Sequence, residues 1–306
     1  MPTEQSQYTP TYLKLFLSGE LQKRIDSLNE ILKECTLCPH QCRVNRLEGK
    51  LGKCRAGKEL KISSAFAHFG EEAPLVGTCG SGTIFLSHCN LKCIFCQNDD
   101  ISHAEIGEII DIQKLASMML VLQQRGCHNI NFVTPTHFVP QLVSALPTAI
   151  RMGLLLPIVF NCGGYESLDV IKLLDGIIDI YMPDVKFSQI EPAKEYCNAP
   201  DYYSNIKLVL KEMHRQVGDL KVDSRGVAYR GLLIRHLVMP NNQAGTKEIM
   251  AFIADEISKD SYVNIMDQYR PCYHASEFPE INRRITHDEY VAAIEKARKN
   301  GLSRGF

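Results

Sequence analysis

Three cysteines, Cys89, Cys93 and Cys96, lie in the stretch SHCNLKCIFCQN at the spacing CxxxCxxC. Iron–sulfur clusters are usually held by four cysteine thiolates. A short loop with three cysteines can wrap three corners of a cubane cluster and leave one iron with an open position, as catalytic zinc sites do. Such an iron can bind and reduce a small molecule. Zinc binding and plain core thiols are the alternatives that the spacing alone leaves open.

A second cysteine set comes earlier, in CTLCPHQCRVNRLEGKLGKC. Four thiolates complete a tetrahedral set for structural zinc or for a closed iron–sulfur cluster, and ligand identity does not separate the two. Gly49 and Gly52 allow the chain to turn back toward the metal, and we expect His40 to lie outside the site. The sequence therefore predicts a second metal held by Cys35, Cys38, Cys42 and Cys54.

The other five cysteines are scattered singly, and isolated cysteines are most often small buried hydrophobic residues. We expect this of Cys79, Cys127, Cys162, Cys197 and Cys272.

Composition limits the class of protein. The chain has 306 residues, twelve cysteines and a formal net charge of −1, so its charge gives no sign of a nucleic-acid partner. No apolar run is long enough to span a membrane, and the start, MPTEQSQYTP, lacks the features of a secretory signal. We expect a cytoplasmic protein, in which many cysteines favour metal ligands over disulfides.

Apolar strands alternate with helices in the larger, C-terminal part of the chain. This order predicts an α/β fold with parallel strands, either an open sheet or a partial barrel. Residues 12–32 add two short amphipathic helices interrupted by Gly19. The working face lies at the carboxyl ends of the strands, and the three-cysteine loop directly follows the first of them. The expected strands are 82–87, 129–134, 157–164, 177–184, 231–240 and 262–269, and the expected helices are 111–126, 138–153, 167–176, 201–218, 246–258 and 286–301.

The three-cysteine loop resembles the cluster motif of the radical S-adenosylmethionine superfamily. The likeness rests on CxxxCx-aromatic-C, with Phe95 as the aromatic residue, placed just after a first strand. The resemblance implies a partial (β/α)6 barrel and a [4Fe–4S] cluster on Cys89, Cys93 and Cys96, with S-adenosylmethionine on the fourth iron. It also implies reductive cleavage of that cofactor to a 5′-deoxyadenosyl radical, which abstracts a hydrogen atom from a substrate.

The same resemblance suggests cofactor contacts. Thr134, Pro135 and Thr136 stand where relatives often carry Gly-Gly-Glu, so they are candidates by position only. The stretch YMPDVKF is similar to the Asp-x-Lys of glycyl-radical activating enzymes, and IRHLVMP to their arginine-bearing strand. The candidates for binding S-adenosylmethionine are Phe95, Asn161, Asp184 and Lys186.

Each polar candidate has a structural alternative. Asn161 can cap a turn, and Asp184 with Lys186 can form a surface ion pair. For Arg235 and His236, which lie inside an apolar strand, we favour the interpretation as satisfied core residues. No catalytic residue is assigned.

The paired cysteine motifs together with VNIMDQYRP resemble one subgroup, the pyruvate formate-lyase activating enzyme-related radical proteins. This implies an N-terminal metal-binding segment (1–76), a radical barrel domain (77–306), an electron donor such as flavodoxin or ferredoxin, and a substrate that is a polypeptide or a small metabolite. The alternatives are an electron carrier with two clusters, and a zinc-stabilised binding module.

Overall fold

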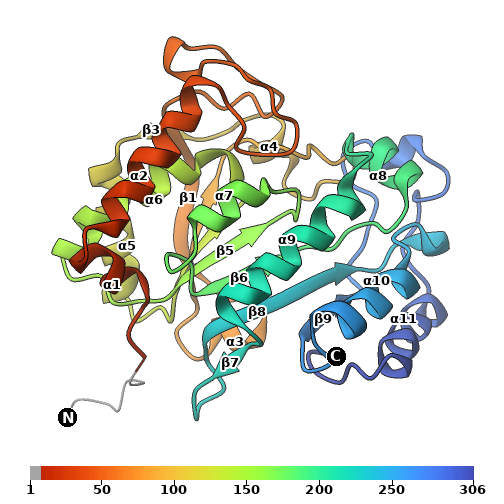
Figure 1. Cartoon of the computed structure of the whole chain (residues 1–306). Coiled ribbons are helices and arrows are strands. Elements are labelled where there is room, and N and C mark those ends of the chain that lie inside the picture. Colours follow the sequence, from red (N-terminus) through yellow and green to blue (C-terminus); the bar gives the residue numbers. More distant parts are fainter. Residues whose placement is uncertain (1–7) are drawn as a thin grey trace.

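The computed structural model describes residues 8–306, and its centre is a mixed sheet of nine strands surrounded by helices (Figure 1). Six of these strands run parallel, each hydrogen-bonded to the next in chain order. The predicted α/β class and the six predicted strands are confirmed. They are β2 (Ser81–Leu86), β4 (Ile130–Val133), β5 (Ile158–Cys162), β6 (Ile180–Pro183), β8 (Ala228–Leu237) and β9 (Tyr262–Met266).

Three further strands are antiparallel and were not predicted. β1 (Leu60–His68) pairs with β2, β3 (Glu108–Ile110) pairs with β1, and β7 (Lys221–Val222) pairs with β8. Only the first and third residues of β1 are buried, and β3 and β7 are short and mostly exposed. None of the three therefore carries the apolar run by which a buried parallel strand is recognised. The sheet thus already begins within residues 1–76.

The six predicted helices are present, with small changes at their ends. The helix predicted over 246–258 is α10 followed by a π-helical turn, Ile253–Ile257. The helices are α5 (Ile112–Gln124), α6 (Val139–Arg151), α7 (Leu168–Leu173), α9 (Tyr202–Val217), α10 (Thr246–Phe252) and α11 (His287–Lys299). Three short helices were not predicted, namely α3 (Ala73–Val76), α4 (Asp99–Ser102) and α8 (Ile190–Cys197).

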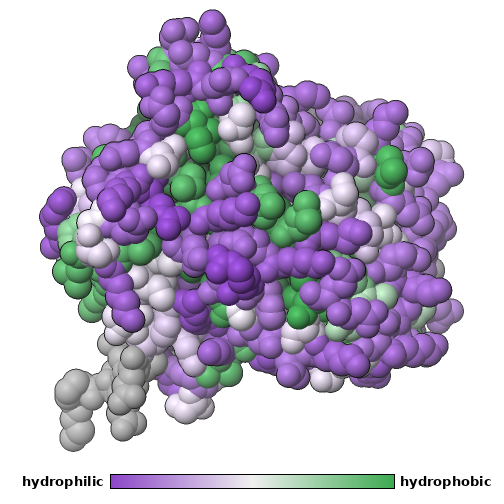
Figure 2. Space-filling model, viewed as in Figure 1, coloured by the Kyte–Doolittle hydropathy of each residue, from purple (hydrophilic) through white to green (hydrophobic). Residues whose placement is uncertain are grey.

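The N-terminal part has two helices and then a long irregular stretch. α1 (Tyr12–Leu17) and α2 (Glu20–Glu30) are separated by Gly19 in the left-handed conformation, as predicted. Figure 1 shows the stretch that follows α2 at the end of the molecule near α4, where the parallel strands end. The face drawn in Figure 2 is mostly hydrophilic, with hydrophobic residues in several separate small groups. Within residues 8–306, no helix has the length and hydropathy needed to cross a membrane.

Candidate functional site

Three polar side chains meet where β5, β6 and β8 end. Asn161 lies in β5, Asp184 follows β6 directly, and Arg235 lies in β8. The backbone continues the sheet through this point, because the Asp184 N–H donates to the Cys162 carbonyl (2.9 Å) and the Val185 N–H to the Arg235 carbonyl (2.8 Å). Adjacent parallel strands bring their carboxyl ends to one edge, so side chains distant in sequence become neighbours.

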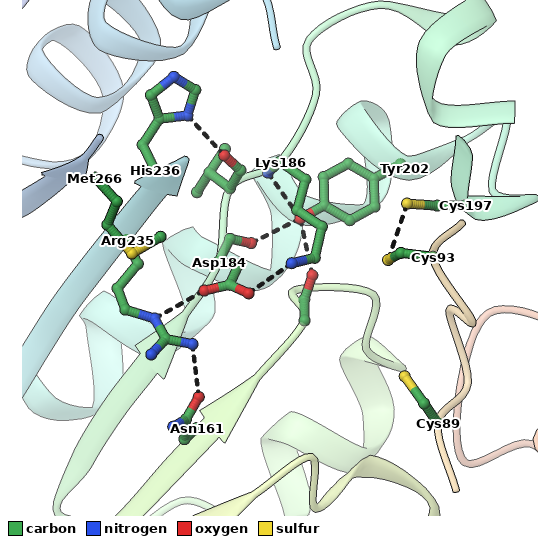
Figure 3. Close-up of polar contacts among 12 residues, drawn as sticks. Cys89, Cys93, Asn161, Asp184, Lys186, Cys197, Tyr202, Arg235, His236 and Met266 are labelled. Carbon is green, nitrogen blue, oxygen red and sulfur yellow. Dashed lines mark hydrogen bonds and ion pairs between the residues drawn. The ribbon is translucent and has the colours of Figure 1, made fainter. Parts of the chain in front are cut away.

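Asp184 is the centre of the resulting network, which Figure 3 shows between Arg235 and Lys186. Its carboxylate accepts from Arg235 Nε at 2.8 Å and from Lys186 Nζ at 2.6 Å. Arg235 Nη2 also donates to Asn161 Oδ1 at 2.8 Å. The side chains of Asp184 and Lys186 are only 17% and 15% exposed. This corrects the surface-ion-pair alternative, since the pair lies inside the fold.

The network favours the charged form of each member. Burial raises the pKa of Asp184, but the charges of Arg235 and Lys186 outweigh burial and hold that pKa below its usual value. Burial alone would lower the pKa of the Lys186 ammonium, but the charge of Asp184 and its hydrogen bond raise that pKa above the usual value. Both groups are therefore ionised at neutral pH, with Lys186 as a fixed positive charge close to Cys93.

The three-cysteine loop opens on the same space. Cys89, Cys93 and Cys96 line a cavity of about 250 Å³ that is also lined by Asn161, Thr134, Asp184, Lys186 and Arg235. Three thiols facing one polar cavity are the donor set that an iron–sulfur cluster with one open iron requires, so the chemistry of the residues fits that group. Within the described residues 8–306, no three histidine, cysteine, aspartate or glutamate side chains are already grouped as a metal site.

Cys197 is a neighbour of this loop that the sequence analysis missed. The sulfurs of Cys197 and Cys93 lie 3.1 Å apart inside the core and share a hydrogen bond (Figure 3). This contact keeps the proton on Cys93, and together with burial it raises the pKa of the Cys93 thiol. Cys197 ends α8, a helix that was not predicted, so no local signal pointed to the contact.

The other four single cysteines divide into two groups. Cys127 and Cys162 are buried, as predicted, whereas Cys79 is exposed and Cys272 is only partly buried. The prediction is wrong for Cys79, because it lies in the turn that leads into β2.

Phe95 and the two threonines after β4 have different surroundings. Phe95 lines the cavity but packs in the core, with its ring 6.0 Å from that of Phe187. Thr134, with a positive φ of 59°, also lines the cavity. Thr136 is buried but does not line the cavity, and its hydroxyl donates to Glu166 Oε1 at 2.9 Å. Burial raises the pKa of Glu166 to about 7.

Arg235 and His236 point in opposite directions from β8. His236 is fully buried, with Nδ1 2.8 Å from the Val185 carbonyl and Nε2 2.9 Å from Thr246 Oγ1. It is thus a satisfied core residue, as we favoured. Arg235 lines the cavity, and its third guanidinium nitrogen, Nη1, faces Glu71 and Glu72 at 3.7 and 3.8 Å. Arg235 is also mostly buried and hydrogen-bonded, but on the cavity side of β8, because residues of alternate parity in a strand face opposite sides.

The first cysteine set lies outside this cavity. Cys35 and Cys54 are buried, and Cys38 and Cys42 are partly buried.

A larger cavity of about 530 Å³ includes Cys79, Cys127 and His128 in its lining. It lies at the amino ends of β2 and β4, away from the edge where parallel sheets bind ligands.

Comparison with known proteins identifies a relative of this chain. No family model matches the chain. The uncharacterized protein MJ0674 of the archaeon Methanocaldococcus jannaschii is 36% identical over 291 residues, which cover 92% of this chain and 79% of that protein. Its name states no activity.

Proposed function

This chain belongs to the same family as the archaeal protein MJ0674, and we propose that it is a radical S-adenosylmethionine iron–sulfur enzyme. When bound, the [4Fe–4S] cluster would supply the one electron that breaks a carbon–sulfur bond of S-adenosylmethionine, releasing methionine and a 5′-deoxyadenosyl radical that becomes 5′-deoxyadenosine by taking a hydrogen atom from a polypeptide or small-metabolite substrate. The observation that carries the proposal is the shared cavity, lined by three cysteine thiols and a charged network built at the strand ends.

The residues of the chain have separate tasks in this proposal. Cys89, Cys93 and Cys96 hold three irons and leave the fourth to the cofactor. S-adenosylmethionine carries an ammonium, a carboxylate and ribose hydroxyls, so its binding requires both acceptors and donors. Asn161 and Asp184 provide the acceptors, and Lys186 and Arg235 provide the donors. Because the network is already formed, little side-chain entropy is lost on binding.

Lys186 has a second effect through its position. Its ammonium lies near Cys93, so it interacts favourably with that sulfur when the sulfur is a thiolate. A cluster held by three thiolates is anionic, and a fixed cation beside it favours the reduced, more negative state. Phe95 contributes packing that keeps the loop in place.

The proposal also covers the type of fold, the cellular compartment and the electron donor. The six parallel strands and their helices form a partial (β/α)6 barrel that carries the site within residues 77–306. All twelve cysteines are free thiols, which suits a reducing cytoplasm. The electron comes from a small carrier of the flavodoxin or ferredoxin kind.

The test uses protein reconstituted with iron and sulfide without oxygen, then mixed with S-adenosylmethionine and dithionite. Chromatography measures 5′-deoxyadenosine. We expect product from the wild type and none from Cys93→Ala, while Cys79→Ala, at an exposed cysteine outside the cavity, matches the wild type. A fully loaded wild-type cluster that yields no product contradicts the proposal.

A second candidate function is supported by Cys197. Its sulfur, 3.1 Å from that of Cys93, is available as a fourth protein ligand, and a cluster with four protein ligands suits an electron carrier without catalysis. Substitution of Cys197 by alanine separates the two functions. An enzyme with three cluster ligands retains its iron, sulfide and product formation, whereas the carrier loses its cluster.

A further inference from the structure

The segment between α2 and β1 has almost no regular structure. Over residues 34–59, all of them described, the one element is the 3-10 turn Arg46–Glu48. Connections of this length without structure of their own are uncommon in compact domains unless they have a function. Cys35 and Cys54 are nevertheless buried, at 9% and 8% exposure. The segment is therefore packed without the hydrogen bonds of a helix or sheet to hold it.

Backbone hydrogen bonds close the first part of the segment into a tight loop. The Cys35 N–H donates to the Val44 carbonyl (3.0 Å), and the Arg43 N–H donates back to the Cys35 carbonyl (2.9 Å). Inside this loop the Gln41 N–H donates to the Cys38 carbonyl at 3.0 Å. Three of the four cysteines are thus held within one closed turn of chain.

The second part of the segment packs directly against that loop. A Cβ added at Gly52 would lie 2.8 Å from Cys42 Sγ, so only glycine allows this approach. The Lys53 N–H donates to the same sulfur at 3.3 Å. Cys54 follows immediately, so the fourth cysteine lies next to the chain that packs against the loop of the other three, although it is distant from them in sequence.

A backbone amide points at one of these sulfurs, since the Lys53 N–H donates to Cys42 Sγ. Amide donors stabilise a sulfur that carries negative charge, as metal-bound thiolates do.

We propose that this segment holds a second metal centre, bound by the thiolates of Cys35, Cys38, Cys42 and Cys54. The four side chains are not already grouped as a metal site, so they close on the metal when it binds, which couples binding to ordering of the segment. The shared ligand chemistry is a thiophilic metal in a closed four-sulfur set, supplied either as zinc or as an iron–sulfur cluster. The inference is independent of the proposed function.

The four-cysteine segment also contacts the two loops beside the cavity, so a metal bound in the segment would help to hold these loops in place. His40 Nε2 lies 2.9 Å from the carbonyl of Asn90, the residue after Cys89. The buried guanidinium of Arg46 donates to the carbonyl of His137, after β4, at 2.7 Å. These contacts connect the four-cysteine segment to the loops that follow β2 and β4.

The experiment removes the other cysteine set, so that the two metals cannot be confused. The variant Cys89→Ser/Cys93→Ser/Cys96→Ser is purified without oxygen, its fold is checked by circular dichroism, and its zinc, iron and sulfide are quantified. We expect a stoichiometric metal that is lost when Cys38→Ser and Cys42→Ser are added. Cys272→Ser, outside both sets, retains it. If the triple variant does not fold, Cys93→Ser alone replaces it.

Zinc without sulfide identifies a metal ion, and iron with sulfide identifies a cluster; either outcome supports the proposal. A folded variant that contains neither overturns it. Failure of the proposed function appears separately, as a wild-type protein that makes no 5′-deoxyadenosine while its four-cysteine segment still contains metal.

Discussion

Lys186 and Asp184 lie 2.6 Å apart, and so do Lys211 and Glu256, but the second pair is about half exposed. Exposed pairs contribute only about 0–1 kcal/mol because water screens them. We expect Lys186→Met to lower 5′-deoxyadenosine formation about tenfold or more, equivalent to ~1.4 kcal/mol, since it removes a donor and the cation beside Cys93.

Lys211→Met is the matched control and is expected to stay within about twofold of the wild type, which corresponds to well under ~1 kcal/mol. Initial rates of product formation, with cluster content measured in each sample, give the comparison. Equal rates for the two variants would place Lys186 outside the reacting site.

The buried carboxyl group of Glu166 leads to a prediction of how the stability of the protein changes with pH. Its side chain is buried, and burial raises the pKa to about 7, against ~4.3 in an unfolded chain. The folded state therefore binds more protons than the unfolded state between these values, so the free energy of unfolding falls as pH rises through them. At ~1.4 kcal/mol per unit, the loss approaches ~4 kcal/mol above pH 7.

Glu166→Gln keeps an oxygen that can accept from Thr136 but cannot ionise. We expect this variant to gain stability relative to the wild type from pH 5 to pH 8, as measured by urea unfolding at each pH. The exposed substitution Glu191→Gln is expected to show no such trend. A constant difference across the pH range would mean that Glu166 is already ionised in the folded protein.

At the level of elements, the turn after β5 sets the spacing of the site. Gly164 has φ of +81°, and a Cβ there would overlap the Asp184 carbonyl and the Tyr202 hydroxyl. Gly153, after α6, has φ of +97° with nothing within 4 Å. Both alanine variants incur the left-handed strain of about 1–2 kcal/mol, but only Gly164→Ala also displaces the strand ends.

We therefore expect Gly164→Ala to lose about 1–3 kcal/mol more than Gly153→Ala, together with most of its product formation. Denaturant unfolding and the activity assay measure the two effects. If both variants lose the same stability, the close approach at Gly164 is not what the turn requires.

The elements that sequence patterns predicted are those with their own local signal. β4, β5 and β6 are almost entirely buried and mostly apolar, with one asparagine each in β4 and β5, and α11 begins with a full capping box at Thr286. β1 and α8 lack such signals, since β1 is half exposed and α8 has Pro192 within its first turn. Their tertiary contacts, not their propensity, determine their structure.

In the candidate site, the residues that belong to a sequence motif were predictable, and the others were not. The three cysteines, Asn161, Asp184 and Lys186 follow strands in a recognisable motif, and the structure brings them to one cavity. Cys197 and Glu71 come from segments without a motif, and their closeness to Cys93 and Arg235 depends on how the chain folds back. Such contacts cannot be predicted from the spacing of residues in the sequence.

At the scale of the whole molecule, Arg46 joins the four-cysteine segment to the sheet. It is 1% exposed, and its guanidinium donates to the carbonyls of Gly57 and His137. Lysine has the charge but not the planar fork, so Arg46→Lys leaves at least one buried carbonyl without its donor. We expect a loss of about 1–3 kcal/mol and faster amide exchange over residues 35–57 than in the sheet.

Arg43→Lys is the control, because Arg43 and its partner Glu34 are each 63% exposed, and it should change stability by no more than about 0.5 kcal/mol. Hydrogen exchange followed by mass spectrometry resolves the two regions. Faster exchange confined to the segment shows that it opens as a unit of its own, fastened to the sheet by Arg46. Uniform acceleration across the chain would instead show that the segment and the sheet unfold together, as one cooperative domain.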